Sequence, residues 1–308
     1  EFIKHSSYYS LWSFKTNWIS KHEIRGKYIL DKIKIITDST CDLSKEIIEK
    51  YDIDVMPMLI NFGEESYLDG VEIKVDSMME RIEREDTLPT TAQIVPTRFI
   101  EKYKGYLEEG YKVISIHISS NMSGTYQSAC LAKAELESDD IVVIDSRNVT
   151  VGLGLIVLKA ARLIESGITL EDLEKEILEY RNHIKSTIAF ESLDNLVRGG
   201  RLSKGKALFV NALGIKLMLN VLDGEMNVQG KIRGTKKMVK AMIEQFDSIP
   251  KKEGEPIILV ELENEDIYLP IKEYLENNNI EYLKLPLGCS VAIHSGPKVC
   301  ALFYVEEY

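Results

Sequence analysis

Short apolar, β-branched runs alternate with longer amphipathic segments along the chain from residue 32 onward. In the first half, the runs that predict strands are "KIKIIT", "IDVMPMLINF", "YKVISIHI" and "DIVVID". Between them, the spacing of apolar residues predicts helices at 44–51, 76–85, 96–109 and 123–136. Strands that alternate with helices in this way are typical of an α/β fold with a largely parallel sheet.

The order of elements changes after residue 150. One helix is predicted to end at Ser166, with Gly167 as its cap, and another to span 169–184. Five further strands, with two helices among them, are predicted at "STIAFE", "IKLMLNVLDGEMNVQGKI", "PIILVEL", "IEYLKLP" and "KVCALFYVE". The Asp-Gly pair within the second run predicts a hairpin, because it supplies the positive φ angles of a tight turn. We therefore expect an antiparallel or mixed sheet in this half.

Two shorter segments complete the expected elements. Residues 203–214 are predicted to form a helix capped by Ser203 and ended at Gly214, and the apolar run at 289–293 has the pattern of a short strand.

We divide the chain into an N-terminal extension of unknown role (1–31), an N-terminal α/β domain (32–167) and a C-terminal α/β domain (168–308).

The composition narrows the class of protein. Of the 308 residues, 44% are hydrophobic and 28% charged, and there is no apolar stretch near the roughly 18 residues that a membrane span needs. A net charge of -11 argues against broad binding to nucleic acid. The four cysteines are scattered, which predicts neither a zinc site nor a disulfide framework and agrees with a cytoplasmic location.

Four clusters of polar residues follow predicted strands, where α/β sheets bind ligands. They are "TDSTCDL" (37–43), "DTLPTTAQIVP" (86–96), "SSNMSGTYQSA" (119–129) and "DSRNVTVGLG" (145–154). Neutral hydroxyls and amides without a nearby Lys suit one carboxylate better than a polyphosphate. Neither of the glycine-rich dinucleotide and P-loop motifs occurs, so no nucleotide cofactor is expected.

Several candidate residues have an ordinary structural explanation beside the functional one. Ser119 and Ser120 lie at a strand end, whereas Ser123 suits the capping of the next helix. His294 is either a structural histidine or, beside a Gly-Pro bend, a side chain that faces a cleft. Gly199 and Gly200, flanked by Arg198 and Arg201, form either a turn or part of a basic surface that contacts another protein.

Two other classes of function stay open from the residues alone. One is a serine hydrolase that uses Ser119 or Ser123 as nucleophile and His294 as base, although the sequence contains no G-x-S-x-G motif and identifies no Asp to orient the histidine. The other is a protein-interaction module without a lipid ligand.

Seven motifs, in order across residues 33 to 305, together resemble the DegV family of bacterial fatty-acid-binding proteins, which includes the binding subunits of fatty-acid kinase. They are "ITDSTCDL", "YLDGVEI", "LPTTAQIVP", "ISSNMSGTYQSA", "VIDSRNVTVGLG", "LVRGGRL" and "IHSGP". The resemblance implies two α/β domains, the first with a Rossmann-like parallel sheet and the second with a mainly antiparallel sheet, and one long-chain fatty acid between them.

The resemblance also implies roles for individual residues. Thr91, Ser119, Ser120 and His294 correspond to the residues that hold the carboxylate, with Ser119 and Ser120 not separable from sequence. Arg201, in the G-G-R motif, corresponds to a contact with a fatty-acid kinase catalytic subunit. A lipid-binding protein of this kind is not itself an enzyme and needs no metal or cofactor.

The chain departs from the family pattern at three places. They are Thr91-Ala92-Gln93-Ile94-Val95, where T-S-Q-P-S is usual, Lys216-Leu217-Met218, where K-P-[ILV] is common, and Lys298, where the family motif G-P-G has its last glycine.

Overall fold

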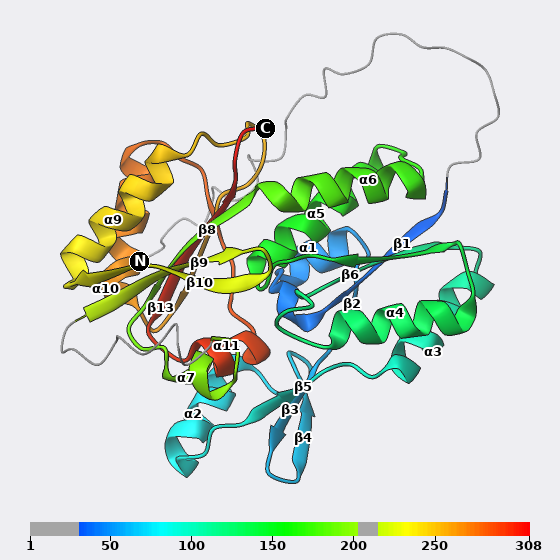
Figure 1. The fold of residues 1–308 in the computed structure, drawn as a ribbon, viewed down its shortest axis with the longest axis horizontal. Coiled ribbons are helices and arrows are strands. Elements are labelled where there is room, and N and C mark those ends of the chain that lie inside the picture. The colour runs from blue at the N-terminus through cyan, green and yellow to red at the C-terminus, as the bar shows by residue number, and fades with distance from the viewer. Residues whose placement is uncertain (1–30, 203–214) are drawn as a thin grey trace, which may run out of the picture. The chain divides into compact units, whose positions relative to one another are not determined.

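A four-stranded parallel sheet forms the centre of the first half of the chain in this computed structural model, which describes residues 31–202 and 215–308 (Figure 1). Its strand order is β2-β1-β6-β7. The strands are β1 (Ile33–Asp38), β2 (Asp54–Met56), β6 (Lys112–His117) and β7 (Ile141–Asp145). All six residues of β1 are buried, as expected for a strand covered on both faces.

Helices cover both faces of this sheet. On one face, apolar residues of α3 and α4 pack against the strands, including Phe99, Tyr103 and Ala129. The other face packs against α5 and α6, where Leu155 and Leu173 belong to the main hydrophobic core. The helices of this half are α1 (Lys45–Lys50), α2 (Val75–Glu85), α3 (Pro96–Glu108), α4 (Thr125–Leu136), α5 (Val151–Glu165) and α6 (Leu170–Tyr180), together with the 3-10 turn η1 (Ser39–Cys41).

A small antiparallel sheet lies beside the parallel one, with the order β4-β3-β5. It consists of β3 (Leu59–Phe62), β4 (Glu65–Leu68) and β5 (Thr90–Ala92). The run "IDVMPMLINF", predicted as one strand, is divided between β2 and β3, which belong to different sheets. Pro57 lies at the division and has no N–H for a ladder, while its carbonyl accepts a hydrogen bond from Arg98.

The second half contains a six-stranded mixed sheet in the order β10-β9-β8-β13-β11-β12. All neighbouring pairs are antiparallel except β11 and β12, which are parallel. The strands are β8 (Ile184–Phe190), β9 (Ile215–Leu222), β10 (Glu225–Arg233), β11 (Ile258–Leu262), β12 (Leu283–Lys284) and β13 (Val299–Val305). The α/β fold class, with a parallel and a mainly antiparallel sheet, is therefore confirmed.

The two faces of this sheet have different neighbours. Helices α9 (Thr235–Ser248) and α10 (Glu265–Asn277) cover one face, where Phe246, Ile271 and Leu302 form a separate core. Side chains of the other face, such as Ile188 and Phe303, belong to the same core as α5 of the first half. The predicted hairpin between β9 and β10 is present, with Asp223 and Gly224 both at positive φ.

The second half also contains the 3-10 turn η2 (Arg181–His183) and two short helices, α7 (Asp194–Arg198) and α11 (Cys289–Ser295). The prediction of a strand at 289–293 is wrong, because these residues belong to α11. The predicted helix at 203–214 lies outside the described residues, as does the extension up to residue 30. Residues 31–308 form one compact unit, and the division at residue 167 stays a prediction.

Candidate functional site

A cavity lies between the inner face of the six-stranded sheet and the strand ends of the first half. It contains about 790 Å³ of atom-free space, a figure that includes space open to solvent. Most of its lining is apolar and comes from both halves of the chain: Met58, Ile118, Met122, Val149, Ile188, Phe190, Leu196, Met226, Val260, Leu287, Val291, Val299, Ala301 and Phe303.

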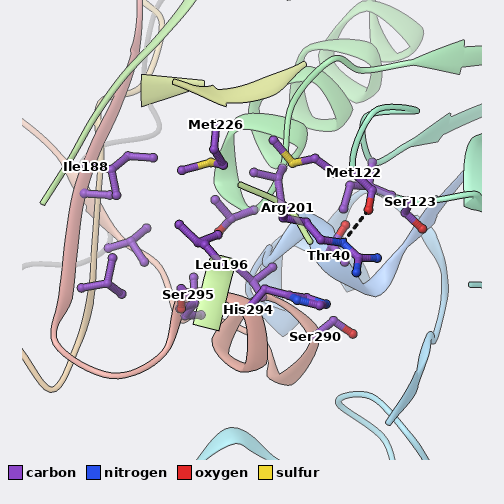
Figure 2. Close-up of a pocket in the computed structure, with 18 of the residues that line it drawn as sticks. Thr40, Met122, Ser123, Ile188, Leu196, Arg201, Met226, Ser290, His294 and Ser295 are labelled. Carbon is purple, nitrogen blue, oxygen red and sulfur yellow. Dashed lines mark hydrogen bonds between the residues drawn. The ribbon is translucent and has the colours of Figure 1, made fainter. Parts of the chain in front are cut away.

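The polar side chains of the cavity are gathered mainly toward one end. Figure 2 shows Thr40, Ser123, Arg201, His294 and Ser290 on one side of the view, while Ile188 lies on the opposite side. The cavity therefore has a polar end formed by neutral hydroxyls, one imidazole and one guanidinium, and an apolar end formed by the sheet. Thr91, Thr150 and Ser295 are the remaining polar lining residues.

Thr91 and His294, which the sequence analysis assigned to one site, are in direct contact. Thr91 Oγ1 lies 2.9 Å from His294 Nε2, although the two residues come from β5 and α11 and are 203 positions apart. Burial, and secondly the charge of Arg201, lower the pKa of His294 to about 4. The imidazole is therefore neutral near pH 7. With its proton on Nε2 it donates to Thr91, which leaves the threonine hydroxyl free to donate to a ligand.

The "RGGR" segment places Arg201 in the wall of the same cavity. Gly199 lies against His294, since a β-carbon at Gly199 would be only 2.3 Å from His294 Nδ1. Gly200 has a φ of 74°, in the left-handed region that favours glycine. Arg201 then donates through Nε to the Met122 carbonyl at 2.9 Å, which joins the two halves beside the cavity. Burial lowers the pKa of Arg201, which nevertheless stays protonated at neutral pH.

Ser123 also lines the cavity, at the start of helix α4. Its Oγ accepts from the Thr125 N–H at 3.2 Å. The expected capping role of Ser123 is wrong, because α4 begins at Thr125 with Gly124 in the N-cap position and without a side-chain cap. The neighbouring Gly124 makes room for Gln93, because a β-carbon there would lie 1.9 Å from Gln93 Oε1. The "TTAQ" and "SNMSGT" motifs therefore meet through this side chain, which also donates to Ser128.

Ser119 and Ser120 do not line the cavity. The hydroxyl of Ser119 is fully buried and donates to the Gly224 carbonyl at 2.7 Å, at the turn of the β9–β10 hairpin. Ser120 is exposed, and its Oγ donates to Asp145 Oδ2 at 2.6 Å. In this structure both hydroxyls thus hold other parts of the chain, and their predicted contact with a carboxylate stays a prediction.

Helix α11 is held at its N-terminus by two buried carboxylates from the first half. Asp42 accepts from the Gly288 N–H at 3.0 Å, and Asp69 accepts from the N–H groups of Cys289 and Ser290, both at 3.2 Å. The first N–H groups of a helix have no partner within the helix, and the side-chain oxygens of Asp42 and Asp69 supply those partners. These contacts fix the helix that presents His294 to the cavity.

The geometry for serine hydrolysis is not formed at the predicted residues. Within residues 31–202 and 215–308, no hydrogen bond joins Ser119 or Ser123 to His294. A chain of the right residue types does exist elsewhere, since Ser115 Oγ lies 2.7 Å from His117 Nε2, and His117 Nδ1 lies 3.0 Å from Asp38 Oδ2. All three residues are completely buried, so a substrate has no access to that serine.

Thr40 and Ser290 are cavity residues that sequence reasoning did not single out. Thr40 lies within the quoted "TDSTCDL" cluster, so the position of that cluster after β1 was a usable indication. Ser290 was missed because 289–293 was interpreted as a strand.

Among the described residues, no group of His, Cys, Asp and Glu has the arrangement of a metal site. No helix in the described ranges has the length and apolar character needed to cross a bilayer.

Comparison with known proteins identifies relatives in sequence and in fold. A family model described as "Uncharacterised protein, DegV family" matches residues 32–307. A DegV domain-containing protein of Clostridium perfringens strain 13 is 99% identical over 279 residues, which cover 91% of this chain and 100% of that protein.

Solved structures with the same fold include two described as fatty-acid binding. A DegV family protein from Thermus thermophilus, described by its fatty-acid binding, has a TM-score of 0.82 and 28% identity, covering 90% of this chain and 100% of that one. DegV of Bacillus subtilis, described as a fatty-acid-binding protein, has a TM-score of 0.79 and 29% identity with the same coverage. The chain belongs to the DegV family.

Proposed function

We propose that this protein binds one long-chain fatty acid in the cavity, with the carboxylate at the polar end and the acyl chain along the six-stranded sheet. The observation that carries the proposal is the separation within one cavity of a hydroxyl-rich end from an apolar end (Figure 2). The fatty-acid binding described for the Thermus and Bacillus proteins supports the same ligand class.

The apolar end supplies most of the proposed affinity. A saturated acid of about 16 carbons has about 14 methylene groups, and each contributes about 0.8 kcal/mol on burial. The sum is on the order of 10 kcal/mol before the cost of ordering the chain. Ile188, Val260 and Phe303, which come from neighbouring strands of the sheet, are suited to enclose such a tail.

The polar end orients the ligand. Thr91 and Ser123 are two of the motif hydroxyls that line the cavity, together with Thr40, Thr150 and Ser295, and Arg201 supplies a positive charge in the same lining. Neutral His294 supports Thr91 as a donor to the carboxylate rather than pairing with it as an ion. For Ser119 and Ser120 to take their predicted role, their hydrogen bonds to Gly224 and Asp145 must first break.

We further propose that the loaded protein presents the carboxylate to a fatty-acid kinase in the cytoplasm and performs no phosphoryl transfer itself. Arg201 lies in the cavity wall and is partly exposed, so it is suited to contact both the ligand and a partner at the mouth. The four cysteines are free, in agreement with a reducing compartment.

Acyl-phosphate formation with a kinase catalytic subunit should fall for Arg201→Lys but not for the exposed Arg198→Lys. Equal losses in the two variants would count against a specific contact of Arg201 with the kinase.

The binding proposal is tested by lipid extraction and rebinding. Denaturing mass spectrometry of the purified protein should release a long-chain fatty acid in about one-to-one ratio with the chain. Delipidated protein should then bind palmitate saturably, with the binding free energy weakening by about 0.8 kcal/mol for each methylene removed from the chain. Absence of a copurified acid together with absence of saturable rebinding would contradict the proposal.

A further inference from the structure

The hydroxyl of Ser290 is buried in the cavity wall without a hydrogen-bond partner among the described residues. The residue is 3% exposed, its Oγ is inaccessible, and it lines the same cavity as Thr91 and His294. A buried hydroxyl that makes no hydrogen bond is unfavourable in a folded protein, so it calls for a partner supplied from outside the chain.

The other serine and threonine hydroxyls of the cavity already have partners. Thr40 donates to Asp38, Thr150 donates to Asp42, and Ser295 donates to main-chain carbonyls. The hydroxyl of Thr91 lies against His294, and that of Ser123 against Thr125. Within the described part of the lining, Ser290 is the serine or threonine whose hydroxyl has no hydrogen-bond partner in the protein.

The position of Ser290 is fixed by the helix that also carries His294. Ser290 precedes His294 by four residues in α11, so both side chains face the same side of the helix. The backbone N–H of Ser290 donates to the buried carboxylate of Asp69 at 3.2 Å. Figure 2 shows its side chain near His294, on the side of the cavity where Arg201 and Ser123 also lie.

We propose that Ser290 is a specificity-determining residue that donates a hydrogen bond to the ligand carboxylate. This inference rests on the proposed binding of a fatty acid. An ionised carboxylate offers two oxygens and about four acceptor positions, so Thr91 and Ser123 leave room for a further donor. Ser290 approaches from α11, whereas Thr91 and Ser123 belong to β5 and the start of α4. The carboxylate would then be bound by hydroxyls of both halves of the chain.

The Ser290→Ala variant separates this role from a structural one. In the delipidated protein, the variant should be as stable as the wild type or slightly more stable, because alanine removes an unpaired polar atom. Its backbone contact with Asp69 is kept. Palmitate affinity at pH 8 should fall about tenfold or more, as expected for a lost hydrogen bond to a charged group. Ser290→Thr keeps the hydroxyl and should restore most of the affinity.

The pKa of the bound acid gives a second readout that a packing defect would not move. With [1-13C]palmitate, the NMR titration of the bound carboxyl should show a pKa about one unit higher in Ser290→Ala, since a donor to the ionised form has been lost. An unchanged carboxyl pKa with palmitate affinity within twofold of the wild type would overturn the inference while leaving fatty-acid binding intact. Failure of the wild type to bind palmitate would instead remove the proposed function and this inference with it.

Discussion

Gly199 lies directly against His294, with an added β-carbon only 2.3 Å from the imidazole Nδ1. Gly199→Ala should therefore displace the ring and break the Thr91–His294 hydrogen bond. We expect a loss of about 1–3 kcal/mol in the free energy of unfolding, the usual cost of overpacking, together with weaker palmitate binding. Urea denaturation and a binding titration measure the two effects.

Gly105 provides the matched control for that substitution. It lies in the exposed part of α3, without a neighbour within 4 Å of an added β-carbon. Gly105→Ala should raise the free energy of unfolding by about 0.5–1 kcal/mol through helix propensity and leave binding unchanged. If Gly199→Ala behaves in the same way as this control, the close contact with His294 has no functional importance.

The lowered pKa of His294 predicts a specific pH dependence. Because its pKa is about 4 in the folded protein and near 6.5 in the unfolded chain, the unfolded state binds more protons between these values. The stability that comes from neutral His294 is complete above pH 6.5 and decreases as the pH falls toward 4. Urea denaturation of the delipidated wild type and of His294→Gln, at pH 7.5 and 5, should show a larger loss for the wild type. Equal losses would mean that His294 titrates normally.

Ser119 and Ser123 have separable roles in the structure. Ser119→Ala leaves the Gly224 carbonyl without its side-chain donor and should lower the free energy of unfolding by about 1–3 kcal/mol. Its effect on palmitate affinity should be smaller. Ser123→Ala should weaken palmitate binding more than it changes the binding of hexadecanol, which carries no charge. Ser120→Ala, at an exposed position, should change neither the free energy of unfolding nor palmitate binding. A selective loss of acid binding in Ser119→Ala would instead favour the role predicted from the sequence.

The helix and strand pattern of the sequence accounts for most of the fold, but long-range contacts decide the site. The amphipathic spacing of α3 and the apolar, β-branched run of β6 are local properties and were sufficient for prediction. Apolar residues at 289–293 do not distinguish a buried strand from a buried helix, so α11 was missed.

The partners of the polar side chains were the least predictable part. Ser119 binds Gly224, 105 positions away, and Thr91 meets His294 only because β5 and α11 pack together. No local pattern could therefore tell that Ser123 faces the cavity while Ser119 holds the hairpin. The resemblance to a family assigned Thr91 and His294 to one site, and their side chains are in contact in the structure, whereas their predicted role in holding a carboxylate stays a prediction.

Lys298 takes a left-handed conformation, with a φ of 64°, at the position where the family motif ends in glycine. Glycine adopts this conformation without the steric cost of a β-carbon. Lys298→Gly should therefore be neutral or stabilising by up to about 1 kcal/mol, whereas the β-branched Lys298→Val should destabilise the protein. Thermal unfolding of the two variants checks the order, and a more stable Lys298→Val would contradict the assignment of backbone strain.

The central claim is that one fatty acid lies in the cavity with its carboxylate at Thr91 and its tail along the six-stranded sheet. A crystal structure with 16-bromohexadecanoic acid tests it most directly, because the anomalous signal of bromine locates the end of the tail. We predict the bromine near Ile188 and Phe303, and the carboxylate within hydrogen-bond distance of Thr91 Oγ1. Bromine at the Thr91 end, or a ligand outside the cavity, would contradict the account.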